Sequence, residues 1–298
     1  MTKIVEKRKS PRGLSYILDS LAFERINNSS SRIIQKRGYR VAAFANDLIG
    51  NWISVFGVWE HEELDQVFKF LKPLSPKFLT STALDVGANI GNHTMCFAQF
   101  FDKVVAFEPN RKTYELLRLN SQAFSNIAPL NYGLGESKGI SIMSEDLLNS
   151  GGAMISSETT QGVPITIEAL DSLDFGNVDI SLIKLDVEGF EEKVLKGGLH
   201  LIQRHAPVIL LEQHESDFID GKSAALELLR QNDYQFFWLK SGSLNPVSYL
   251  AAIENALEVF FGRTHRIFSS IDVPVGNYPM IIASPTKYSP LLLGQTSA

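Results

Sequence analysis

The sequence predicts an α/β protein with a mostly parallel sheet and helices on both faces. From residue 82 onward, short apolar runs alternate with segments of helical periodicity. Strands spaced in this way are joined by right-handed crossovers, which leave neighbouring strands parallel. The first run, Ala83 to Val86, breaks into Gly87-Ala-Asn-Ile-Gly91 before a helix begins, which is typical of a nucleotide-binding turn.

Residues 1–78 are predicted to form a helical N-terminal extension, and residues 79–298 the α/β domain. Four apolar residues of the extension fall at positions i, i+3, i+4 and i+7 of one amphipathic helix: Leu64, Val67, Phe68 and Leu71. Pro73 and Pro76 end this helix, because proline cannot continue the hydrogen-bond ladder. Residues 1–12 carry five basic residues against one acidic residue, which predicts a solvated tail.

The α/β region is expected to contain eight main strands and four main helices in alternation. The expected strands are 83–86, 103–108, 127–132, 163–167, 180–185, 207–212, 234–239 and a last, antiparallel one at 278–283, with an edge piece at 140–143. The expected helices are 92–101, 109–123, 191–203 and 223–231. Residues 144–162 are polar and rich in glycine and serine, which predicts a mobile loop, and residues 241–276 read as irregular or partly helical.

Composition and charge indicate a soluble cytoplasmic protein. The 44% hydrophobic and 20% charged fractions are those of an ordinary globular chain. The net charge of −5 gives no general attraction to nucleic acid or anionic lipid, so neither is expected as a partner. No apolar run approaches the roughly 20 residues of a spanning helix, and the charged N-terminus is unlike a secretory signal. The single cysteine, Cys96, fits a reducing compartment.

The glycine turn favours an adenosine ligand without a pyrophosphate. Gly87 allows a tight reversal, and Gly91 permits close packing or close approach of a ligand. Asn89 stands where the dinucleotide fingerprint has its middle glycine. Glu108 ends the next strand about 20 residues later, where an acid accepts both ribose hydroxyls and would repel a 2′-phosphate. On the turn alone, an ordinary strand–helix connection remains the alternative.

Acids recur at the predicted carboxyl ends of the strands, where open parallel sheets bind ligands. Asp85 lies in the first strand, and Asp186 and Glu188 follow the strand at 180–185. The latter pair would hold an ammonium or sulfonium group, bind a metal or act as a general base, unless Glu188 only caps the next helix. His214, close after Glu212, is either a base or structural. Histidine spacing of the His-x-x-x-His kind is absent, so no metal site is predicted.

Four segments together resemble the FkbM family of methyltransferases. They are Leu84-Asp-Val-Gly-Ala-Asn-Ile-Gly-Asn-His-Thr94, Phe107-Glu-Pro-Asn110, Leu182-Ile-Lys-Leu-Asp-Val-Glu-Gly-Phe-Glu191 with Val194-Leu-Lys-Gly197, and the strand from Pro207 to Glu212. Their order and spacing match the family across residues 82–212, and Gly57-Val-Trp-Glu60 resembles the helical lead-in of many members.

The resemblance implies a class I methyltransferase fold, Rossmann-like with a seven-stranded sheet, and S-adenosyl-L-methionine as cofactor. It implies O-methylation of a hydroxyl on a sugar or other small metabolite. The residues that it assigns to the cofactor are Asp85, Gly87 and Gly91 of the first motif, with Asn89 in the same turn, Glu108 at the ribose, and Asp186 with Glu188 facing the methyl donor.

Our functional prediction is therefore methyl transfer to a hydroxylated small molecule, for example a saccharide, with Asp186, His214 and Glu188 as catalytic residues. An alcohol is a weak nucleophile, so base or metal assistance is needed. Two alternatives remain open: an NAD-linked oxidoreductase, which Asn89 and the paired acids disfavour, and a non-catalytic binding protein of the same fold. The acceptor and the oligomeric state are not predicted.

Overall fold

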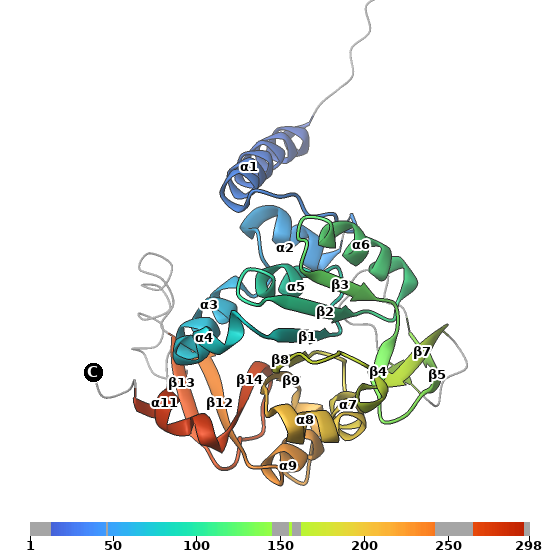
Figure 1. Ribbon diagram of the computed structural model, residues 1–298. Coiled ribbons are helices and arrows are strands. Elements are labelled where there is room, and N and C mark those ends of the chain that lie inside the picture. The colour runs from blue at the N-terminus through green and yellow to red at the C-terminus, as the bar shows by residue number, and fades with distance from the viewer. Residues whose placement is uncertain (1–12, 46, 145–154, 157–161, 242–264, 295–298) are drawn as a thin grey trace, which may run out of the picture.

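One large sheet organises the protein, as the computed structural model in Figure 1 shows. The structure describes residues 13–45, 47–144, 155–156, 162–241 and 265–294. Within these ranges the sheet has eight strands in the order β13-β12-β14-β9-β8-β1-β2-β3. Their bounds are His265–Ser270 (β13), Tyr234–Ser241 (β12), Tyr278–Pro285 (β14), Val208–Gln213 (β9), Ile180–Leu185 (β8), Thr82–Val86 (β1), Lys103–Phe107 (β2) and Ile127–Leu130 (β3).

The predicted mostly parallel α/β sheet is confirmed. The five strands from β9 to β3 are parallel neighbours, and β14 inserts antiparallel between β9 and β12. The sheet has one strand more than the seven expected, because β13 pairs antiparallel with β12 along its outer edge. The expectation of irregular chain over 241–276 is therefore wrong at residues 265–270, whereas residues 242–264 lie outside the described ranges.

Helices cover both faces of the sheet (Figure 1). One face carries α3 (His61–Phe70), α4 (Ser75–Phe78), α5 (Asn92–Phe97), α6 (Arg111–Ser121) and α11 (Ser289–Leu293), and the other carries α7 (Glu191–Gly197), α8 (Leu199–His205) and α9 (Ala224–Arg230). Alternate residues of β1 feed the two cores: Leu84 and Val86 belong to the α7–α9 side, and Ala83 to the α3 side.

A second, smaller sheet stands beside the first. Its order is β4-β7-β5-β6, with bounds Gly133–Gly135, Val163–Ala169, Gly139–Met143 and Ile155–Ser156. The strand predicted at 127–132 thus ends early, and the chain continues into this second sheet. The helix predicted at 191–203 is divided into α7 and α8 at Gly197-Gly198. A Cβ on Gly197 would lie 2.0 Å from the carbonyl oxygen of Gly135, so β4 packs directly on this glycine. Most of the loop predicted over 144–162 lies outside the described ranges.

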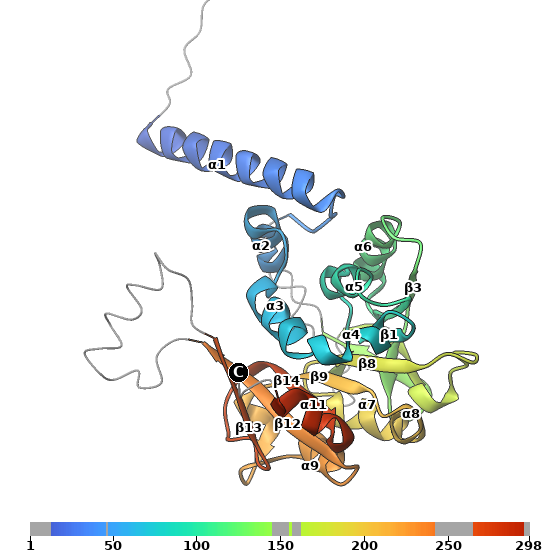
Figure 2. The same ribbon diagram turned by 60° about the vertical axis from the view of Figure 1, so that its left-hand side comes forward.

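The N-terminal extension is helical in its described part, as predicted. Its first helix is α1 (Leu14–Arg37), which contacts α2 (Leu48–Phe56) and lies far from the sheet (Figure 2). Helix α3 shares a core with the sheet, and the boundary at residue 78 stays a prediction. The basic tail over residues 1–12 lies outside the described ranges. Within those ranges, no helix combines the length and apolar character needed to cross a membrane.

Candidate functional site

A cavity of about 270 Å³ opens at the carboxyl ends of β1, β2, β8 and β9. Six of the eight predicted site residues line it: Gly87, Asn89, Glu108, Asp186, Glu188 and His214. The other two, Asp85 and Gly91, are buried behind its wall. The sheet order explains this meeting, because neighbouring parallel strands bring their carboxyl ends to one edge. Glu212 and Lys184 also line the cavity.

The glycine turn after β1 is shaped by close backbone packing. Gly87, Asn89 and Gly91 all have positive φ angles, of 77°, 50° and 93°. A Cβ on Gly87 would lie 1.8 Å from the carbonyl oxygen of Asp186, so only glycine fits there. The side chain of Asn89 accepts a hydrogen bond from the backbone N–H of Ile90, which supports the left-handed conformation of a residue other than glycine.

Glu108 is a buried carboxylate held by the backbone of two loops. Its Oε2 accepts a hydrogen bond from the N–H of Asn89 at 3.0 Å, and its Oε1 accepts one from the N–H of Asn110 at 2.8 Å. Burial raises the pKa of Glu108 to about 7, and these two hydrogen bonds oppose the shift. The structure thereby fixes this carboxylate against the glycine turn, at the wall of the cavity.

Lys184 is a buried ammonium that joins two of the predicted acids. Its Nζ lies 2.9 Å from Oδ2 of Asp186 and 3.6 Å from Oδ1 of Asp85, and it donates a 3.3 Å hydrogen bond to the carbonyl of Gly87. Burial favours the neutral form of Asp186, but the charge of Lys184 and a hydrogen bond with Glu212 overcome it and lower the pKa of Asp186. Asp186 is therefore ionised at neutral pH.

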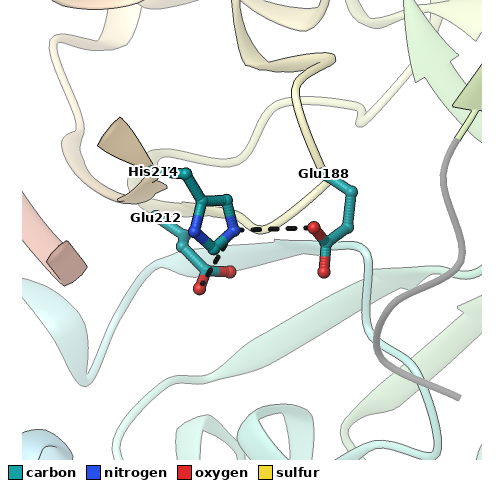
Figure 3. A group of neighbouring side chains, drawn as sticks. All are labelled: Glu188, Glu212 and His214. Carbon is teal, nitrogen blue, oxygen red and sulfur yellow. Dashed lines mark ion pairs between the residues drawn. The ribbon is translucent and has the colours of Figure 1, made fainter. Parts of the chain in front are cut away.

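Glu188, Glu212 and His214 converge on one point of the cavity wall (Figure 3). Nε2 of His214 lies 3.5 Å from Oε2 of Glu188 and 3.7 Å from Oε1 of Glu212. Burial, followed by the nearby charge of Asp186, raises the pKa of Glu212 to about 10, so this carboxyl keeps a proton at neutral pH. Burial and the charge of Asp186 also raise the pKa of Glu188, against the opposing effect of His214.

The turn that carries Glu188 is fixed by a second glutamate. Glu188 has a φ of 52°, a conformation that costs energy for any residue except glycine. Oε1 of Glu191 accepts hydrogen bonds from the N–H groups of Val187 and Gly189, at 3.2 and 3.3 Å. Burial raises the pKa of Glu191 to about 7. Glu188 therefore does not cap α7; its side chain faces the cavity, and Glu191 holds the turn in place.

The N-terminal extension closes the opposite wall of the cavity. The N–H of Trp59 donates to Oδ1 of Asn92 at 2.9 Å, and Nδ2 of Asn92 donates to the carbonyl of Trp59 at 3.1 Å. Next to this link, Oε2 of Glu60 lies 3.3 Å from Nε2 of the buried His93. The loop before α3 is thus anchored on the first turn of α5.

Four residues of the site are not predicted from the sequence. Lys184 gives a weak signal, because a lysine interrupts an apolar strand, and Glu191 stands within the quoted motif as the first residue of a helix. Glu60 and His93 also stand within quoted segments, but nothing in the sequence pairs them, since they meet only when the extension packs on the glycine turn. The cofactor and catalytic roles of the eight predicted residues stay predictions.

Known proteins resemble the central part of the chain. The Methyltransferase FkbM domain matches residues 85–236, half of the chain. The hexuronic acid methyltransferase AglP of Haloferax volcanii is 38% identical over 122 residues, which are 40% of this chain and 50% of that protein. The chain thus matches about half the length of this curated relative.

Two solved structures show a weaker likeness. Methyltransferase FkbM from Methylobacillus flagellatus KT is 21% identical, with a TM-score of 0.34 over 45% of this chain and 32% of that one. The METTL16 methyltransferase domain is 11% identical, with a TM-score of 0.46 over 88% and 79%. Scores at this level support no argument about function. The domain match over half of the chain carries the conclusion: this protein belongs to the FkbM family of methyltransferases.

Proposed function

We propose that the protein uses S-adenosyl-L-methionine to methylate a hydroxyl oxygen of a saccharide. One observation carries this proposal: the glycine turn with Glu108 and the group Asp186, Glu188 and His214 line the same cavity. The glycine turn proposed to bind the nucleoside and the side chains proposed to accept the proton therefore face one cavity, in a chain that belongs to a methyltransferase family.

The residues present fit the cofactor. Glu108 is oriented by two backbone N–H groups and is free to accept ribose hydroxyls on the cavity side. Gly87 lets the backbone run close to the ligand, and Oδ1 of the buried Asp85 makes no hydrogen bond to any described residue. When bound, S-adenosyl-L-methionine would supply a methyl group on a positively charged sulfur, and Asp186 would offer a carboxylate to that charge.

The chain's own tasks are to orient the acceptor, exclude water and receive the hydroxyl proton. Two side chains are candidate acceptors of this proton. Asp186 is ionised because Lys184 compensates its charge, and His214 presents an imidazole between two carboxyl groups. A saccharide acceptor is supported by the relative named as a hexuronic acid methyltransferase. Half of the length of that relative aligns with this chain.

The two alternatives differ in what they predict for ligand binding. An NAD-linked oxidoreductase is disfavoured by the family match and by Asn89, which occupies the place of a glycine of the dinucleotide turn. A non-catalytic binding protein would bind the cofactor without turnover.

Calorimetry and product analysis separate these functions. We expect binding of S-adenosyl-L-methionine but not of NAD, and transfer of a labelled methyl group to at least one member of a panel of saccharides that includes hexuronic acids. Mass spectrometry of the product after base treatment separates ethers at hydroxyls from esters at carboxylates. Tight NAD binding without S-adenosyl-L-methionine binding would refute the proposal.

A further inference from the structure

We propose that Glu188, Glu212 and His214 form a binding site for one divalent transition-metal cation, which holds the oxygens of the acceptor. The proposal adds a ligand to the site described above, and the part that concerns the acceptor rests on the proposed function. The histidine spacing of the sequence predicts no metal site, because the three side chains come from two segments that are separate in the sequence. Glu188 follows β8, and the other two lie at the end of β9.

The geometry of the three side chains suits a metal ion. One oxygen of each glutamate and one nitrogen of His214 all lie within 4.8 Å of one another. The imidazole nitrogen is 3.5 Å from one carboxylate and 3.7 Å from the other. Ligands that each stand about 2.0–2.2 Å from a common ion have separations of this size. Figure 3 shows the two contacts meeting at Nε2, with the carboxyl group of Glu188 beside the ring and that of Glu212 below it.

The cavity around these three side chains has an excess of acidic groups. Five carboxyl groups line it, those of Glu60, Glu108, Asp186, Glu188 and Glu212, whereas Lys184 is the sole lysine or arginine among its described lining residues. The nearby imidazole of His93 is engaged elsewhere, because its Nε2 lies 3.3 Å from Oε2 of Glu60. A divalent cation would therefore find a complementary charge at this point of the wall.

The ligand set also decides the class of cation. Two carboxylates with one imidazole suit Mn²⁺ or Zn²⁺ better than Mg²⁺ or Ca²⁺, which prefer oxygen ligands throughout. Three protein ligands leave positions open for the acceptor. A hydroxyl bound there becomes more acidic, and its proton passes to the carboxylate of Asp186 as the O–H bond breaks. With the cation bound, His214 acts as a ligand and not as a base.

Binding of Mn²⁺ to the chelator-treated full-length protein tests the site, with the free-ion signal in electron paramagnetic resonance as the readout. We expect one Mn²⁺ per chain, and about tenfold or greater loss of affinity in both Glu212→Gln and His214→Ala. Glu215→Gln is the matched control, because it removes an exposed carboxylate next to His214 and should bind Mn²⁺ like the wild type. Circular dichroism confirms that each variant is folded, and Glu188→Gln gives a third ligand variant.

Wild-type protein that binds neither Mn²⁺ nor Zn²⁺ stoichiometrically would overturn the site, as would affinities unchanged in all three variants. The proposed function fails separately. If S-adenosyl-L-methionine binds and methyl transfer proceeds in excess chelator, the role of the cation in holding the acceptor is refuted and the methyltransferase function stands. If the metal binds but S-adenosyl-L-methionine does not, the methyltransferase function is refuted and the metal site stands.

Discussion

The carbonyl oxygen of Asp186 lies directly against Gly87, at a point 1.8 Å from where a Cβ of residue 87 would be. The turn after β1 and the turn after β8 are therefore in backbone contact, although they are 99 residues apart in sequence. The ammonium of Lys184 bridges the same two turns, through the carbonyl of Gly87 and the carboxylate of Asp186. The glycine turn and Asp186 are therefore held together by backbone packing and by the side chain of Lys184.

Substitution Gly87→Ala should weaken both folding and cofactor binding. The left-handed backbone costs about 1–2 kcal/mol for alanine, and the overlap with Asp186 adds about 1–3 kcal/mol. Gly176→Ala is the matched control, because Gly176 has a similar φ of 71° with nothing within 4 Å of its Cβ position. Urea unfolding measures the free energy of unfolding of the two variants. Equal losses in the two variants would show that the contact with Asp186 is unimportant.

Cofactor affinity should fall as the pH drops below about 7, the pKa to which burial raises Glu108. Ribose hydroxyls donate to the ionised carboxylate, so binding lowers its pKa and favours the deprotonated form. The affinity is thus complete above pH 7 and should be about tenfold weaker at pH 6 than at pH 8. Isothermal titration calorimetry of S-adenosyl-L-methionine across this range measures it.

Variants of Glu108 and Glu191 show which of the two carboxyl groups causes this pH dependence. Glu108→Gln should bind weakly and with little dependence on pH, while Glu108→Ala should weaken cofactor binding with little effect on the fold. The pKa of Glu191 is also raised to about 7, so Glu191→Gln is the control and should keep the wild-type dependence. A flat profile in Glu191→Gln would transfer the effect to that residue.

Substitution His214→Ala should lower turnover and leave the affinity for S-adenosyl-L-methionine close to that of the wild type. Loss of a base or of a metal ligand at the acceptor costs about 10²-fold or more in kcat. His200→Ala is the control, because its side chain is 89% exposed on α8. Steady-state kinetics with the identified acceptor gives the answer, and wild-type turnover in His214→Ala would make His214 structural.

Substitution Glu191→Ala should reduce kcat through the position of Glu188. Without its carboxylate, the N–H groups of Val187 and Gly189 lose their acceptor, and the strained turn at Glu188 is released. Glu192→Ala is a matched control, since Glu192 pairs with Lys196 on the exposed surface of the helix, where ion pairs contribute little to stability. Differential scanning calorimetry separates lost activity from lost stability. If both variants keep wild-type kcat, Glu191 does not position the turn.

Elements with a strong local signal were predicted closely. β8 has the predicted bounds, and the last strand is antiparallel as expected, because apolar runs between turn residues identify buried strands. The differences between predicted and observed elements arise from packing against residues that are distant in the sequence. Helix 191–203 is divided where β4 presses on Gly197, and β13 forms because β12 offers it an edge. Neither partner is visible within a local window of sequence.

The amino-acid sequence was enough to locate the glycine turn, Glu108 about 20 residues after it and the acids at several strand ends, because these depend on short spacings along one chain segment. The tertiary structure decided which of them meet. The order β9-β8-β1-β2 places His214 beside Glu188 and Lys184 between Asp85 and Asp186. Those contacts set the pKa values and create the candidate metal site, since charge interactions depend on distance in space and not on separation in sequence.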